Sequence, residues 1–410
     1  MIFPVFVALY GLAHVYIWHA IVSGVRLAVW AQGALALGLL ALGVTPFLAR
    51  RLERRGYVGL ARLFAWVGYT WAGLVLLFVL ARFGTDLLMV VVAAAGWSAP
   101  QGLTHLLPLI ATAIFTTTLA VYSFIERSRV RVESIDVPTA KAMGATPLLR
   151  VAQISDVHIG SMNGRRRIRT VVRRLNEIRP DVVVSTGDLI DSRAGLLAPV
   201  TDLLAAVQPP LGKFAVIGNH ECYAGLGSSL AFMERAGFTV LRNEAISLPG
   251  IRLVGMDDPA AGQEAQLALR EQQLLRELPD KVFTVLLKHR PDLVPGSQTR
   301  FDLQLSGHTH KGQMFPFGLL TRLYYPAHAG LFRLAQASYL YVSRGTGAWG
   351  PPFRLLAPPE ITVFTIGSGR PDPGGQPIPQ GRAEGTAATS ARPASATVYA
   401  AAGFRRPSRR

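Results

Sequence analysis

The chain has 410 residues, which exceeds one typical domain, and its simplest division is a membrane part, a soluble part and a tail. Hydrophobic residues make up 50% of it and charged residues only 16%, a composition that favours partial embedding in lipid. The single cysteine, Cys222, excludes an intrachain disulfide. The net charge of +17 lies mostly beside apolar segments or in the tail, and no nucleic-acid motif accompanies it, so we expect no DNA or RNA partner.

The N-terminal third is strongly apolar. A transmembrane helix needs about 20 mostly apolar residues, and four stretches reach or approach that length, at residues 1–22, 27–48, 63–80 and 106–124. The first lacks the basic start and the cleavage site of a signal peptide, so we expect it to persist as a span. Residues 87–96 are too few to cross a bilayer and are predicted to be re-entrant or interfacial. Residues 1–126 are therefore predicted to form an all-α transmembrane bundle.

Arginine indicates the orientation of this multi-pass bundle. The loop between the second and third spans is crowded with basic side chains, namely Arg50, Arg51, Arg54, Arg55 and Arg62. Loops rich in Lys and Arg stay on the cytoplasmic side. With four spans both termini follow that loop, so the soluble part is predicted to face the cytoplasm.

From residue 148 the pattern changes to short apolar runs of strand length: LLRVAQIS, DVVVST, KFAVI, IRLVG, FTVLL, LQLS, YLYVS and EITVFTI. Helices are predicted at residues 168–178, 196–207, 226–236 and 263–278. This alternation predicts an α/β domain over residues 148–366. Residues 127–147 are predicted to be a linker, and residues 367–410 a disordered basic tail whose arginines either contact anionic lipid or remain solvated.

A polar cluster directly follows five of the predicted strands. The clusters read SDVH, GDLID, GNHE, KHRPD and GHTH in chain order. Ligands of open α/β sheets bind beyond the carboxyl ends of the strands, where such loops converge. We therefore expect these five clusters to build one site.

The clusters supply carboxylate, amide and imidazole donors without a thiolate, a set that suits Mn, Fe or Zn. Two divalent ions about 3.5–4 Å apart form a known hydrolytic arrangement, which needs a bridging carboxylate. Asp188, from the second strand, is the natural bridge. Alternate residues of an extended segment point to one side, so Asp156 with His158, and His308 with His310, are each expected to address one cleft from extended backbone.

The order DxH, GDxxD, GNHE, H and GHTH resembles the calcineurin-like metallophosphoesterase superfamily over residues 148–366. The continuations SGHTHKGQ, YVSRGTGAWGPPFR and PPEITVFTI look like a bacterial branch that often carries N-terminal membrane helices. Relatives in that branch include phosphodiesterases and an enzyme that hydrolyses UDP-2,3-diacylglucosamine in lipid A synthesis. The resemblance implies an αββα sandwich after the transmembrane bundle, two divalent metal ions such as manganese, and a place in the inner (cytoplasmic) membrane.

The resemblance also implies roles for individual residues. The first metal would be held by Asp156, His158 and His310, the second by Asn219, His289 and His308, with Asp188 bridging both. His220 would protonate the leaving oxygen and Asp191 would hold it in place. The alternative for His220 is a purely structural hydrogen bond at a strand end.

Three further residues have two interpretations each. Arg344 either binds substrate or caps a sheet edge. Lys311 stands where many relatives have glycine, and it either contacts phosphate or is solvated. Ser192 stands where the protein phosphatases of this superfamily have a phosphate-binding arginine, which argues against a phosphoprotein substrate. Cys222 is interpreted as a small residue behind the site, because a two-metal site activates water and needs no thiolate nucleophile.

Together these observations predict a membrane-anchored two-metal hydrolase of phosphate esters or pyrophosphates. Its expected partners are membrane lipids and a phosphorylated small-molecule or lipid-linked substrate, with UDP-2,3-diacylglucosamine as an example. The alternative is a membrane sensor or transporter with a regulatory, weakly active phosphoesterase domain, but the spans contain almost no charged residues to line a transport path.

Overall fold

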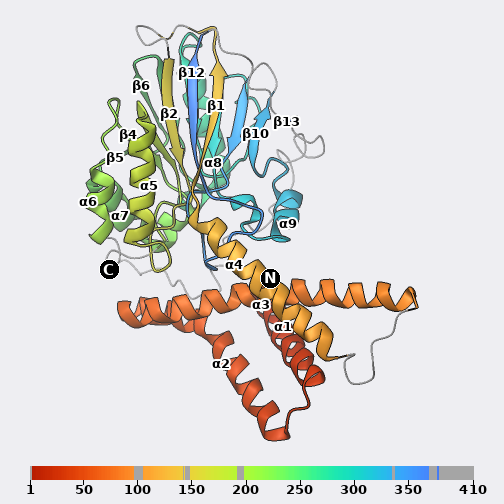
Figure 1. Cartoon of the computed structure of the whole chain (residues 1–410). Helices are drawn as coiled ribbons and strands as arrows, with labels where there is room; N and C mark the ends of the chain where they lie inside the picture. The colour runs from red at the N-terminus through yellow and green to blue at the C-terminus, as the bar shows by residue number, and fades with distance from the viewer. Residues whose placement is uncertain are drawn as a thin grey trace. The chain divides into compact units, whose positions relative to one another are not determined.

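The computed structural model describes residues 2–96, 105–141, 143, 148–191, 198–334, 338–368 and 376–377. It divides into two compact units, an N-terminal helical unit up to Phe124 and an α/β unit that begins at Ile125 (Figure 1). Ser192 and nearly all of the predicted tail lie outside the described residues.

The described residues of the helical unit form four helices: α1 (Ile2–Gly24), α2 (Val29–Arg54), α3 (Val58–Ala94) and α4 (Leu106–Ser128). All four are long and apolar enough to cross a membrane. Many of their leucine, valine and phenylalanine side chains are exposed, as expected for helices that face lipid instead of a protein core. Small residues allow close packing between them, since Gly68 of α3 lies directly against the backbone of Pro46 in α2.

The predicted re-entrant piece at residues 87–96 is not a separate element. Helix α3 continues through it to Ala94, which makes α3 a single helix of 37 residues. Residues 87–96 look separate in the sequence because Arg82 and Asp86 interrupt the apolar run. In the structure these two side chains form an ion pair at 2.8 Å, one helical turn apart, so the charges are paired along the helix and the helix does not end.

The α/β unit contains two sheets. The first has six strands in the order β1 (Arg131–Pro138), β12 (Glu360–Gly367), β2 (Leu148–Ile154), β3 (Val182–Thr186), β4 (Lys213–Val216) and β5 (Phe238–Val240). The second has seven, in the order β13 (Gln376–Pro377), β10 (Gly330–Arg333), β11 (Tyr339–Val342), β9 (Leu303–Ser306), β8 (Phe283–Leu287), β7 (Ile251–Gly255) and β6 (Glu244–Leu248). Strands β2 to β5 are parallel, as are β7, β8, β9 and β11.

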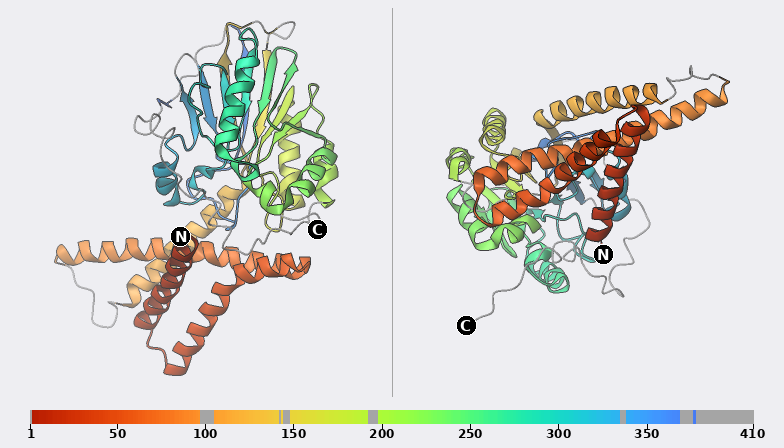
Figure 2. Two further views of the ribbon diagram at one scale, coloured as in Figure 1. Left: turned by 180° about the vertical axis from the view of Figure 1, so that it is seen from behind. Right: turned by 90° about the horizontal axis from the view of Figure 1, so that it is seen from below.

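Helices cover the outer faces of both sheets, which gives the αββα sandwich that the sequence resemblance implied (Figure 2). Helices α5 (Arg165–Ile178), α6 (Ala198–Ala205) and α7 (Asn219–Arg235) pack on the first sheet, and α8 (Glu264–Glu277) packs on the second. A separate core fills the space between the sheets. Alternation along β2 shows why: Leu149 and Val151 face the inner core, whereas Ala152 and Ile154 face the helices.

The predicted linker at residues 127–147 contains a strand. Residues 131–138 form β1, which pairs in parallel with β12 along its whole length. Its sequence RVESIDVP mixes charged and apolar residues because β1 is an edge strand, and only one side of its backbone is paired. The carboxyl ends of the parallel strands lie at the same edge of the sandwich. The loops that follow these ends carry the residues of the predicted site.

Candidate metal centre

Each predicted ligand follows a strand of the parallel sheets. Asp156 and His158 follow β2, and Asp188 follows β3. Asn219 and His220 begin α7 after β4, and His289 follows β8. His308 precedes and His310 begins η3 (His310–Gly312), the 3-10 turn after β9. The structure thus brings all seven predicted ligands to one edge of the sandwich.

Asp156, His158 and His310 form one group of donors. One ligand atom from each lies within 4.8 Å of the other two. The Nε2 atoms of His158 and His310 are 3.0 Å apart, and Nε2 of His310 is 3.3 Å from Oδ1 of Asp156. All three residues are buried.

Asp188, His289 and His308 form a second group within the same limit. Nε2 of His289 lies 3.1 Å from Oδ2 of Asp188 and 3.0 Å from Nδ1 of His308. Oδ1 of Asn219 is 3.2 Å from the same Nε2 atom. The second group together with Asn219 therefore includes the three predicted ligands of the second metal and the predicted bridge, Asp188.

Asp188 stands between the two groups. Its Oδ2 atom is 3.1 Å from Nε2 of His289 and 3.9 Å from Nε2 of His158. In both groups imidazole nitrogens lie close to each other and to carboxylate oxygens. Two divalent cations fit such a donor set, because each would accept lone pairs that otherwise face one another.

Hydrogen bonds behind the ligands orient the imidazole of His289 and hold the backbone of His158. Nδ1 of His289 lies 2.9 Å from the carbonyl oxygen of Thr186, which directs Nε2 into the site. The side chain of Asn163 is buried and donates to the carbonyl oxygens of His158 and Ala348, at 3.1 and 2.6 Å. Asn163 also accepts a hydrogen bond from Arg127 in the last turn of α4, at 2.9 Å.

The ligand loops are not extended, contrary to the prediction for Asp156, His158, His308 and His310. These four residues and Asp188 have φ between 50° and 70°, in the left-handed region. The chain turns sharply just past each strand, because the strands end before the ligands begin. The paired side chains still reach one site, but through tight turns.

Two glycines allow the backbone of one ligand loop to lie against a carboxylate of another. A Cβ atom on Gly218 would lie 2.2 Å from Oδ1 of Asp188, and one on Gly307 would lie 2.2 Å from Oδ2 of Asp156. Both carboxylates therefore pass directly over backbone that only glycine can supply.

The charges of the site separate the pKa values of its histidines. Burial would lower the pKa of His289, but the carboxylate of Asp188 raises it to about 10. Burial and the nearby His220 lower the pKa of His158 to about 3. Divergent pKa values among adjacent buried groups are typical of functional sites.

His220 lies beside the first group of donors. Its ring packs edge-on against His158, with centroids 4.7 Å apart. Nδ1 of His220 is 2.6 Å from Oδ1 of Asp191, and Nε2 is 3.9 Å from Oδ2 of Asp188. His220 therefore has one nitrogen occupied by Asp191 while the other points toward the predicted metal bridge, as a proton donor at this position requires.

Arg344 is held by carboxylates of the first sheet. Its guanidinium is bonded to Glu133 on β1 and to Glu360 on β12. This arrangement favours the interpretation of Arg344 as a residue that ties the sheet edge together. Lys311 lies half-exposed in η3, one residue after His310.

Arg354, whose side chain is completely buried, was not predicted as a site residue. It donates hydrogen bonds to the carbonyl oxygens of Arg344, Gly347 and Ala357, and one of its terminal nitrogens lies 3.1 Å from Nδ1 of His310. A lone arginine among prolines and leucines has no recognisable spacing. The available signal was the charge itself inside the apolar run PPFRLL.

Aromatic rings surround the donors and were also missed. Trp349 and Tyr223 lie beside His220, with ring centroids 5.7 and 5.6 Å away. Tyr325 packs edge-on against His308 at 5.6 Å. Their positions depend on loop conformations that no periodic pattern encodes.

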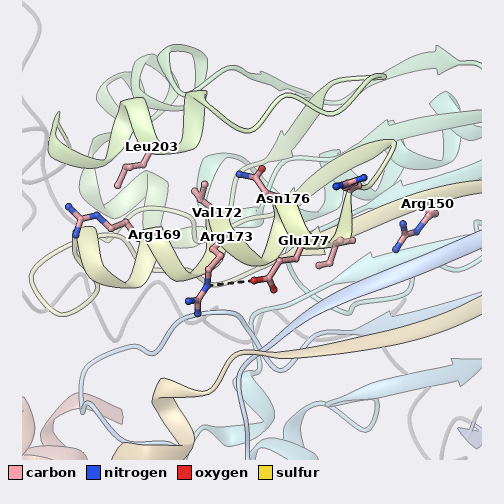
Figure 3. Close-up of a pocket in the computed structure, with 9 residues that line it drawn as sticks. Arg150, Arg169, Val172, Arg173, Asn176, Glu177 and Leu203 are labelled. Atoms are coloured by element: carbon pink, nitrogen blue, oxygen red, sulfur yellow. Dashed lines mark ion pairs between the residues drawn. The ribbon is translucent and has the colours of Figure 1, made fainter.

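A separate pocket lies on the outer side of α5 (Figure 3). Its lining includes Arg169, Arg173 and Asn176 of α5, together with Arg150 and Leu203. Arg173 pairs with Glu177 across one helical turn at 3.8 Å. None of the predicted metal ligands lines this pocket, so it is distinct from the metal centre.

Known proteins resemble this chain in the same region. A model of the calcineurin-like phosphoesterase family matches residues 149–312. An uncharacterized metallophosphoesterase from Aquifex aeolicus is 38% identical over 251 residues, which cover 60% of this chain and 96% of the relative. A dimetal phosphatase of known structure from Danio rerio is 15% identical, with a TM-score of 0.33 over 49% of this chain and 88% of that one.

One relative also extends into the helical unit. A transmembrane protein with metallophosphoesterase domain from Bos taurus is 30% identical over 393 residues, which cover 87% of this chain and 86% of the relative. A similarly described protein from Danio rerio is 32% identical, over 62% of this chain and 61% of its own length.

Proposed function

The chain belongs to the calcineurin-like metallophosphoesterases and is a metal-dependent phosphoesterase with four apolar helices, and on this premise we propose that it hydrolyses phosphate esters or pyrophosphates of lipid- or nucleotide-linked substrates at a membrane surface. The reaction class follows from the family. The substrate class is supported by the membrane helices, which would hold the metal centre close to lipids.

The position of Asp188 carries the two-metal proposal. One of its carboxylate oxygens lies between His158 of the first group and His289 of the second, at 3.9 and 3.1 Å. In the proposed centre Asp188 would help to hold both ions. Asp156, His158 and His310 would hold the first ion, and Asn219, His289 and His308 would hold the second. Manganese, iron and zinc all suit these donors, and we propose manganese for the first assays.

Bound divalent ions would neutralise phosphoryl oxygens and lower the pKa of a shared water to near neutrality. The chain supplies the rest of the chemistry. His220 donates a proton to the leaving oxygen from Nε2, while Asp191 holds Nδ1 and keeps the ring in one orientation. The buried carboxylates of Asp156 and Asp188 fix the positions at which positive charge is held.

We further propose that the metal centre faces the cytoplasm from the inner membrane. The arginines at the end of α2, in the connection after it and at the start of α3 support this orientation, because basic segments beside membrane helices are retained on the cytoplasmic side. Reporter fusions after residue 128 and after residue 26 would test it. Cytoplasmic reporter activity at residue 128 is expected, and periplasmic activity there would refute the orientation.

Hydrolysis by the purified protein tests the proposed function directly. We would purify the full chain in detergent and assay Mn-dependent cleavage of bis-p-nitrophenyl phosphate, p-nitrophenyl phosphate and UDP-2,3-diacylglucosamine. Asp188→Asn should reduce turnover by more than about 100-fold, since it removes the bridging charge and weakens metal binding. Asp280→Asn is the matched control, because Asp280 is exposed and pairs only at the surface with Arg300.

The outcomes separate the two functional hypotheses. Cleavage that is lost in Asp188→Asn and kept in Asp280→Asn would support the enzyme, and the preferred substrate would narrow its class. Absence of turnover with manganese, iron and zinc would favour a regulatory phosphoesterase domain attached to a membrane sensor or transporter.

A further inference from the structure

The short helix α9 (Phe317–Tyr324) exposes an unusually apolar surface. None of its eight residues is buried. Its large hydrophobic side chains and two neighbours are exposed, from 43% at Phe317 to 74% at Leu323. We call this set the α9 surface: Phe315, Phe317, Leu319, Leu320, Leu323, Tyr324 and Leu356.

Helix α8 of the same unit shows the usual behaviour. It buries Leu274 and Leu275 against the second sheet and exposes a single large apolar residue, Leu269, at 67%. Single exposed leucines need no explanation, but a contiguous apolar patch on a soluble domain marks a site of interaction. The α9 surface brings seven exposed large apolar side chains together on and beside one short helix, whereas α8 exposes one.

The α9 surface adjoins the end of the membrane helix α4. Oε2 of Glu126, in the last turn of α4, accepts a hydrogen bond from the backbone of Leu356 at 3.0 Å. The preceding residue, Leu355, accepts one from the backbone of Phe315 at 3.2 Å. One short strip of backbone therefore connects the last turn of α4 to the start of the α9 surface, and the last turn of α4 belongs to the α/β unit itself.

Basic side chains accompany the apolar ones. Arg322 is exposed on α9, and Arg129 and Arg131 are exposed just after α4. Basic residues beside an apolar helix are the pattern of segments that lie in the interface of an anionic membrane. A protein partner would gain little from cations placed around the point where a membrane helix ends.

The same helix is joined to the metal centre. It follows η3, which begins with His310, and the backbones of Gly312 and Gly318 are so close that a Cβ on Gly312 would lie 2.2 Å from the nitrogen of Gly318. Tyr325, directly after α9, packs against His308. A shift of α9 would therefore move the surroundings of two predicted ligands, His308 and His310.

We propose that the α9 surface docks into the interface of the bilayer that α4 crosses, as a second membrane contact of the α/β unit. The bilayer covers the exposed leucine and phenylalanine side chains, and Arg322, Arg129 and Arg131 face its anionic headgroups. The metal centre then lies at the lipid surface. As a consequence that rests on the proposed function, a lipid phosphoester reaches the metal ligands without leaving the membrane.

Site-specific fluorescence tests the contact independently of catalysis. In a Cys222→Ser background, Leu320→Cys and, separately, Leu323→Cys are labelled with an environment-sensitive dye in the full chain. Each is reconstituted into vesicles of neutral and anionic phospholipid that carry a spin label near the headgroup end of the acyl chain. Leu269→Cys on α8 is the matched control, because it is an exposed leucine of the same unit.

Dyes at positions 320 and 323 should be quenched about twofold or more relative to unlabelled vesicles, since interfacial helices insert to the headgroup–acyl boundary. The dye at position 269 should be unaffected by the spin label and accessible to iodide in water. If the lipid label quenches the dye at neither α9 position, the proposal is overturned. This holds whether the dyes are open to iodide or are shielded from it by a second copy or another protein.

Hydrolysis of bis-p-nitrophenyl phosphate by the same labelled proteins is measured in parallel. Lipid quenching without hydrolysis would count against the proposed function and leave the α9 contact standing. Hydrolysis without lipid quenching would support the proposed function and count against the α9 contact.

Discussion

Nδ1 of His220 lies 2.6 Å from the Oδ1 atom of Asp191. Burial by itself would lower the pKa of His220, but the carboxylates of Asp188 and Asp191 raise it to about 9. The two carboxylates thus favour the protonated imidazole, the form in which it can act as an acid.

This pair predicts the pH dependence of the reaction. A general acid must be protonated, so turnover of a substrate with a poor, alkyl leaving group should fall as pH rises through the pKa of His220. Asp191→Asn removes a charge that raises this pKa, and the descending limb should therefore move down by about 1–3 pH units. The kcat profile of an alkyl phosphodiester measures the shift.

His220→Ala sets the reference for that experiment. We expect kcat for the alkyl ester to fall by about 10²- to 10⁴-fold, the typical contribution of a general acid. Metal content, measured by mass spectrometry, should not change, because His220 is not a proposed ligand. An unaltered kcat in His220→Ala would show that His220 only makes a structural hydrogen bond.

Asn163 is predicted to support His158 from behind. Asn163→Ala leaves two buried carbonyl oxygens and the guanidinium of Arg127 without this partner, which should cost about 1–3 kcal/mol of unfolding free energy. If His158 holds a metal ion, metal affinity should also drop by about 10- to 100-fold. Asn176→Ala, at an exposed site on α5, is the control, and equal metal affinity in both variants would contradict the supporting role.

Glu221 holds the ligand loops after β3 and β4 in register. Its carboxylate accepts hydrogen bonds from the backbone nitrogens of Gly218, Asp188 and Ile190, at 2.7, 3.0 and 3.0 Å. In Glu221→Gln at least one backbone N–H would face the N–H group of the glutamine amide. We therefore expect the free energy of unfolding to fall by about 1–3 kcal/mol and the Tm to fall by several degrees. Thermal unfolding of Glu221→Gln against the surface variant Glu177→Gln measures this, and equal Tm values would refute it.

Cys222 should be chemically inert. Burial, with smaller effects from neighbouring carboxylates, raises the pKa of its thiol from 9.0 to about 12. The reactive thiolate is then scarce near neutrality, so alkylation by iodoacetamide at pH 8 should be roughly 100-fold or more slower than in the urea-unfolded chain. The rate should rise with pH across the alkaline range. Rapid alkylation coupled to loss of hydrolysis would instead make Cys222 part of the reaction.

The ligand positions were the most predictable part of the site. Each lies in a polar cluster directly after a buried strand, and this placement follows from burial and chain direction alone. Their backbone conformation was not predictable from spacing. Asp156 and His158 look like alternate residues of an extended segment, but β2 ends at Ile154 and both residues adopt positive φ.

Elements defined by distant partners escaped prediction. Strand β1 exists because it pairs with β12, more than two hundred residues later in the chain. Arg354 is buried because several backbone carbonyls converge on it, and those carbonyls come from loops that are ordered only in the fold. Helix α9 has only eight residues, too few for its apolar face to stand out as a helical period in the sequence.

The left-handed backbone of the ligand loops has a consequence for the evolution of the protein. Asp156, His158, Asp188, His308 and His310 each occupy a conformation that costs a residue with a Cβ on the order of 1–3 kcal/mol. Glycine at any of these positions would relieve that strain. A population of variants selected for heat resistance alone would therefore be expected to lose its metal ligands early, while variants selected for turnover retain a fold that is less stable than the sequence could achieve.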